Sequence, residues 1–240
     1  MAYKKALLAF MVIMTVLQLK VTAYNADYPP YLFKDGAPNC IQAELLVSER
    51  GEQFYRSKDG QIKAVLIEGH DYNDVMLYDG KNKLPLVWDW YVHSIYCYDV
   101  DGNGYKDFII LHYSRMNGLG LEGDAVEIFL KMNTSEYVHI FYGTTYSGIE
   151  DFLDLNGDGK AEVIIPGFYY GNKHNFFTYS IYEFDKGKLV NADAKYKGFP
   201  KFVWFTFEPN DRNTTSIDAA TKERLVKEKD DSIQYEIIRF

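Results

Sequence analysis

The chain has 240 residues, of which 17% are aromatic, and a formal net charge of −8 at pH 7. An acidic chain argues against nucleic acid as a partner, because binding to a phosphate backbone needs a basic surface. The 21 Tyr and 16 Phe residues favour strands and supply enough apolar side chain for one sizeable core.

The first 23 residues have the pattern of a secretory signal peptide. Lys4 and Lys5 precede an apolar run at residues 6–19, and small residues lead up to Ala23. The run is too short to span a bilayer comfortably, so we predict cleavage after Ala23 and no membrane insertion afterwards. Residues 24–240 are then predicted to be a single domain of a secreted or periplasmic protein.

The chain contains two cysteines, Cys40 and Cys97. In an oxidising compartment such a pair is consistent with a disulfide, whereas two buried free thiols are the alternative.

Three copies of one unit follow along the chain, each made of a polar turn, a short apolar strand, a connection and a hairpin. The predicted strands lie at residues 63–67, 75–78, 108–111, 125–130, 137–140, 163–165, 179–184 and 189–190. Equivalent positions at Lys63, Lys106 and Ala161 are 43 and 55 residues apart, which is the period range of propeller blades. The turn before the first copy, residues 57–60, lacks the acids of the other two, and we predict no metal there.

The second and third copies begin with loops of the same design, residues 99–107 and 154–162. Each has a carboxylate or amide oxygen at positions one, three and five, a backbone carbonyl at position seven and a carboxylate at position nine. The candidate metal ligands are Asp99, Asp101, Asn103, Tyr105, Asp107, Asp154, Asn156, Asp158, Lys160 and Glu162. Hard oxygen ligands at this spacing suit Ca²⁺. Glycines at positions four and six allow the tight curl that such a loop needs.

The same residues allow two alternatives to a calcium loop. An EF-hand requires a Glu at position twelve and a following helix, but Ile110 and Ile165 stand there and the following residues favour strands. Simple turns rich in Asp, Asn and Gly are the second alternative. Two copies of the full ligand pattern favour calcium over simple turns. Because the two sites lie in separate repeats, we expect nearly independent contributions to stability.

The C-terminal part is predicted to add a strand at residues 202–207, a helix from Ser216 to Lys229, and a closing strand at residues 233–238. Residues 24–240 are thus predicted to be a single all-β, calcium-binding repeat domain, a propeller-like repeat of short antiparallel sheets with one C-terminal helix.

The two loops and the strands that follow them resemble the FG-GAP/VCBS-type repeat of integrin alpha-chain propellers and many secreted bacterial proteins. The resemblance covers residues 99–110 and 154–167. It implies an ion held in a hairpin-like loop between two strands of one blade, usually with a structural role. The chain departs from the family pattern in having Glu162 at the ninth position and in lacking the full signature sequence, and it is too short for seven blades.

The sequence carries little evidence of catalysis. Its five histidines are scattered, and no zinc-protease spacing, nucleophile elbow or phosphate loop occurs. Glu150 and Asp151 precede the second loop and are interpreted as neighbours of its cation, with acid–base chemistry as the alternative.

Aromatic residues favour a binding module instead. Trp88 and Trp90 are interpreted as core residues, while Tyr169 and Tyr170 are interpreted as an exposed pair. We therefore predict a module that binds a protein or carbohydrate, with Ca²⁺ in a structural role. The alternative is a polysaccharide hydrolase or lyase on a propeller-like scaffold, which would need convergent carboxylates in a central cleft.

Overall fold

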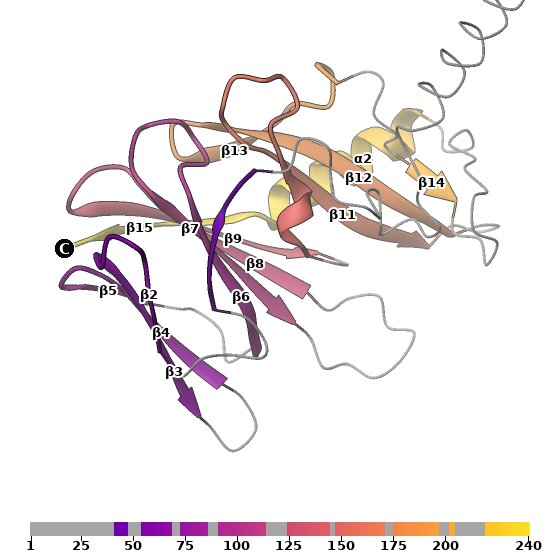
Figure 1. Cartoon of the computed structure of the whole chain (residues 1–240). Helices are drawn as coiled ribbons and strands as arrows, with labels where there is room; N and C mark the ends of the chain where they lie inside the picture. The colour runs from indigo at the N-terminus through magenta and orange to yellow at the C-terminus, as the bar shows by residue number, and fades with distance from the viewer. Residues whose placement is uncertain are drawn as a thin grey trace, which may run out of the picture.

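The computed structural model describes residues 41–47, 54–68, 73–85, 91–113, 124–144, 147–170, 175–196, 202–204 and 219–240. The predicted signal peptide, Cys40 and the Trp88–Trp90 stretch lie outside these residues. Figure 1 shows several antiparallel sheets arranged one after another along the colour gradient. Among the described residues, no helix has the length and apolar composition of a membrane-spanning segment.

Three four-stranded meanders of the same topology form the body of the protein. The first consists of β2 (Phe54–Arg56), β3 (Ile62–Glu68), β4 (Asn73–Asp79) and β5 (Asn82–Leu84). The second consists of β6 (Tyr91–Tyr98), β7 (Asp107–Tyr113), β8 (Asp124–Lys131) and β9 (Glu136–Thr144). The third consists of β10 (Phe152–Leu153), β11 (Glu162–Tyr170), β12 (Asn175–Asp185) and β13 (Lys188–Asn191), preceded by the short helix η1 (Ile149–Asp151). In each meander the first turn joins two paired strands, so all three turns are hairpin connections.

Elements outside the repeats extend these sheets. Strand β1 (Glu44–Val47) pairs with β6, and β15 (Gln234–Arg239) pairs with β9, which makes the second sheet six-stranded. Strand β14 (Phe202–Trp204) pairs with β12. Helix α2 (Ala219–Ser232) precedes β15 and lies behind β11 and β12 in the view of Figure 1. The described sheets form an open stack and do not close into a ring.

The six-stranded sheet is the middle layer, because it is buried on both faces. Phe108 and Ile110 pack with core residues of the first sheet such as Leu77, whereas Ile109 packs with residues of the third sheet such as Val163. Alternate side chains of β7 thus enter two different cores. Burial on both faces also explains why β8 and β9 are apolar along nearly their whole length.

Cys97 lies in the core between the first and second sheets, as a free thiol. Burial raises the pKa of this thiol to about 12, so it stays protonated and unreactive at neutral pH. Of the two alternatives that the sequence left open for Cys97, the structure has the free thiol.

One buried cluster of ionisable groups interrupts the apolar middle layer. The two carboxylate oxygens of Glu127 lie 2.8 Å from Nε2 of His112 and 2.9 Å from Nε2 of His139, and all three side chains are nearly inaccessible to water. Burial alone would raise the pKa of Glu127, but the two histidines in contact with its carboxylate outweigh burial and lower the pKa below its ordinary value. The carboxylate is therefore held in its ionised form.

The Glu127 cluster predicts a specific loss of stability in acid. A folded-state pKa below the unfolded one stabilises the protein above the unfolded pKa of about 4.3, and this contribution is lost as pH falls through the folded pKa. Glu127→Gln should cost about 1–3 kcal/mol at pH 7, because one histidine then faces an amide that cannot accept its hydrogen bond. Urea unfolding at several pH values should find that this difference shrinks below about pH 4. A difference independent of pH would contradict the assignment.

Candidate metal centre

The loop of residues 99–107, hereafter loop 1, connects β6 to β7, and the loop of residues 154–162, hereafter loop 2, connects β10 to β11. Both therefore follow the first strand of a meander. Gly102 and Gly104 in loop 1 have φ of 72° and 88°, and Gly157 and Gly159 in loop 2 have 78° and 85°. These values lie in the left-handed region that glycine adopts without a steric penalty.

Five hydrogen bonds recur at the same positions in the two loops. The first-position carboxylate accepts two of them: Asp99 accepts from the N–H groups of Asn103 at 3.0 Å and Gly104 at 2.8 Å. Asp154 accepts from Asp158 and Gly159, both at 3.0 Å. Loops of independent origin would have no reason to match bond for bond, so the sequence repeat is also a structural repeat.

The ninth-position acid closes each loop. Asp107 is fully buried, and its carboxylate accepts the N–H groups of Val100 at 2.9 Å and Lys131 at 2.8 Å. Glu162 is 2% exposed and accepts the N–H of Leu155 at 2.6 Å. These acids therefore bind the second residue of their own loop, in addition to their predicted role as ligands.

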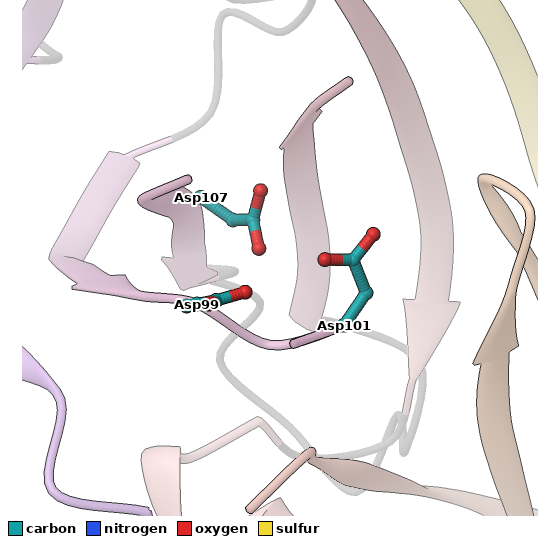
Figure 2. Close-up of side chains that lie close together, drawn as sticks. All are labelled: Asp99, Asp101 and Asp107. Carbon is teal, nitrogen blue, oxygen red and sulfur yellow. The ribbon is translucent and has the colours of Figure 1, made fainter. Parts of the chain in front are cut away.

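Loop 1 brings three carboxylates together. Ligand oxygens of Asp99, Asp101 and Asp107 all lie within 4.8 Å of one another. Figure 2 shows the three carboxylates turned toward one shared space. The amide of Asn103 adjoins them, since its Nδ2 donates to Asp101 at 3.1 Å. Tyr105 donates its backbone N–H to Asn103, and its ring is partly exposed.

The electrostatics of loop 1 favour a bound cation. Burial, helped by the neighbouring carboxylates of Asp101 and Asp99 and opposed by the hydrogen bonds to Asp107, raises the pKa of Asp107 to about 8. Burial and Asp99 also raise the pKa of Asp101, against the lowering effect of the Lys160 ammonium. Such shifts mean that three negative charges cannot share this space without counter-charge. An all-oxygen donor set of this charge fits a divalent cation of the Ca²⁺, Mg²⁺ or Mn²⁺ class.

Loop 2 has the same outline with a different interior. The amide Nδ2 of Asn156 lies between two carboxylates, donating to Asp158 at 3.2 Å and to Glu162 at 3.1 Å. Among the described residues, only the acids of loop 1 converge within the range given above. Burial raises the pKa of Glu162, as does the charge of Asp158. Asp154 holds the loop backbone, and Lys160 donates its N–H to Asp158 at 2.9 Å.

Two features of the site were not predicted from the sequence. Lys131, at the end of β8, uses its backbone N–H for Asp107 and its carbonyl for Nδ2 of Asn103 at 3.0 Å. The loops also touch: the N–H of Ala161 donates to the carbonyl of Val100 at 2.8 Å. We expected nearly independent contributions to stability because the two sites lie in separate repeats. The two loops are in contact, so this reason for independence does not hold.

The other predicted residues are placed as follows. Asp151 lies on η1 and accepts the N–H of Gly148 at 3.0 Å, and the adjacent Glu150 is exposed. Tyr169 and Tyr170 end β11, and residues 171–172 lie outside the described part of the chain.

Comparison of the chain with protein-family models, with curated proteins and with solved structures finds no match. The resemblance to the FG-GAP/VCBS-type repeat therefore rests on the loop residues themselves.

Because the loop glycines are left-handed, adding one methyl group should destabilise the protein more in a loop than in a strand. Gly104→Ala adds a Cβ that meets no atom within 4 Å, so its cost is purely conformational. We expect a loss of about 1–2 kcal/mol in the free energy of unfolding. Gly143→Ala on β9 is the matched control, because a Cβ there is equally uncrowded and needs no left-handed backbone. It should change stability by less than about 0.5 kcal/mol in urea unfolding. Equal effects of the two substitutions would contradict the loop geometry.

Proposed function

We propose that this protein is a secreted, calcium-stabilised β-repeat module that binds a protein or carbohydrate ligand. The observation that carries the proposal is the pair of loops with the same hydrogen-bond pattern, one of which gathers three carboxylates around one space. The loops lie between the first two strands of their meanders, as the FG-GAP/VCBS resemblance implies. Face-to-face packing of four-stranded meanders is also how propeller blades associate, which supports a propeller-like architecture.

Ca²⁺ acts structurally in this proposal. A cation held by Asp99, Asp101 and Asp107, with Asn103 and the carbonyl of Tyr105 as further oxygen ligands, would neutralise the buried negative charge of loop 1. Asp154, Asn156, Asp158, Glu162 and the carbonyl of Lys160 would do the same in loop 2. Since each loop connects paired strands that border the main core, neutralising it stabilises the fold rather than a reaction centre.

Calcium should raise the stability of the chelator-treated protein. Because the ion binds the folded state, the gain is about 2.7 kcal/mol per site at a hundredfold excess over the dissociation constant. Titration calorimetry should find two sites that prefer Ca²⁺ over Mg²⁺. Asp101→Ala and Asp154→Ala should each weaken one site and reduce the calcium-dependent rise in melting temperature.

Asp185→Ala is the control for these substitutions, because Asp185 is an exposed carboxylate in the β12–β13 turn and belongs to neither loop. It should leave the rise in melting temperature unchanged. A protein that binds no calcium, or that loses ligand binding with an unaltered melting temperature in the loop variants, would refute the structural role.

The outer face of the first sheet supports the binding part of the proposal. Arg56 and Lys63 are cross-strand neighbours, and each places its cation 4.9 Å from the centre of the Phe54 ring. Lys63 also lies 5.9 Å from the ring of its other neighbour, Tyr78. No carboxylate of the described chain pairs with Arg56 or Lys63 in a salt bridge. On an acidic protein this face is a local positive surface, which suits a carboxylated carbohydrate.

Removing these cations should weaken binding to an acidic polysaccharide. Arg56→Gln with Lys63→Gln is expected to reduce retention on immobilised polygalacturonate at low salt, and the loss should fade at high salt because exposed charges are screened. Lys188→Gln, an exposed lysine of β13, is the matched control. Equal retention of the two variants, or equal binding of wild type to neutral dextran, would count against this surface.

A further inference from the structure

The two loops meet through their backbones at a buried point. Val100, the second residue of loop 1, is fully buried, and Ala161, the eighth residue of loop 2, is 1% exposed. The hydrogen bond from Ala161 N–H to the Val100 carbonyl lies outside the ladder of either sheet. In this setting a lost partner leaves a buried polar group unsatisfied, so the two residues must keep their relative position.

This contact continues on both sides to a proposed ligand. The N–H of Val100 donates to the carboxylate of Asp107, the ninth residue of loop 1. Ala161 directly precedes Glu162, the ninth residue of loop 2, which in turn accepts the N–H of Leu155. The closing acids of the two loops are therefore linked through Val100 and Ala161 by two hydrogen bonds.

Two side chains add to the contact. The methylene chain of Lys160 lies over Gly102, so close that a Cβ on this glycine would be 3.0 Å from Cγ and 3.1 Å from Cε of the lysine. The hydroxyl of Tyr98 donates to the carbonyl of Gly159 at 3.4 Å. Strand β6 thus contacts loop 2 through Tyr98, directly before loop 1, and loop 2 covers loop 1 through Lys160.

We infer that the two loops form one coupled cation-binding unit, in which filling either loop raises the affinity of the other. This inference rests on the proposed calcium binding and adds a property that two separate repeats would not have. The physical cause is shared ordering: a loop that is fixed by its ion fixes Val100 or Ala161, and the second loop then loses less conformational freedom when it binds. Repulsion between the two bound cations opposes this effect, but shared ordering outweighs it.

Calcium titration followed by amide NMR separates the two sites. Gly102 and Gly104 report on loop 1, and Gly157 and Gly159 report on loop 2. Loop 1 is disabled by Asp99→Asn with Asp101→Asn, and loop 2 by Asp154→Asn with Asp158→Asn, which keep the side-chain shape. The affinity of the intact loop should fall at least about fivefold in each variant, and by the same factor in both, because coupling is reciprocal. Unchanged affinity, a rise in affinity, or unequal losses would overturn the inference.

Hydrogen exchange provides a second test, which does not require a measured affinity for loop 2. In the variant with loop 2 disabled, filling loop 1 should slow hydrogen exchange of the Ala161 amide, because its acceptor Val100 becomes ordered. Unaltered exchange would overturn the inference. Lys160→Ala, which removes the side chain over Gly102 and keeps the backbone carbonyl, should reduce the coupling, whereas Lys188→Ala at an exposed position of β13 should not.

The results distinguish this inference from the proposed function. If wild-type protein binds no calcium, the proposed function fails. If it binds two calcium ions with independent affinities, calcium binding stands and the coupling is refuted.

Discussion

Burial of the middle sheet on both faces is the constraint on which the rest of the structure depends. A strand that leaves such a layer carries peptide groups that water cannot reach, and these groups need partners within the protein. The buried acids at the ninth position meet this need: Asp107 accepts the N–H groups of Val100 and Lys131, and Glu162 accepts that of Leu155. The same carboxylates that suit a cation therefore also accept hydrogen bonds from backbone N–H groups that would otherwise be buried without a partner.

Local pattern predicted most of the repeat units. Apolar and β-branched residues mark β7 and β8 to within two positions. Strand β11 instead continues beyond its predicted end at residue 165 to Tyr170, through residues expected in a connection. The pairing of β1 with β6 and of β15 with β9 could not be predicted from local pattern, since the partners are far apart in the sequence. The two-residue strand β10 is too short to have a period, and it exists because it pairs with the start of β11.

Some residues of the candidate site could be predicted from the sequence and others could not. Ligand positions within each loop were predictable because nearly all of the loop's hydrogen bonds join residues of one nine-residue segment. Lys131 contributes only backbone groups, which any residue could supply, so no side-chain pattern could indicate it. The buried Glu127 was equally hidden: its alternation in β8 is that of an outward-facing residue, and burial follows from the first sheet and from two histidines on other strands.

Exchange of Asn and Asp between the loops explains how two different sequences produce one geometry. In loop 1 the amide of Asn103 at position five donates to Asp101 at position three, and in loop 2 the amide of Asn156 at position three donates to Asp158 at position five. Both pairs thus make the same side-chain bond in opposite order.

The longer side chain of Glu162 fits this exchange, because its carboxylate also reaches the amide of Asn156. This contact gives a physical reason for the glutamate by which loop 2 departs from the family pattern. The amide oxygen of each asparagine also accepts a backbone N–H, from Tyr105 in loop 1 and from Asp158 in loop 2, so each asparagine is held through both its donor and its acceptor and fixes the loop in the same way.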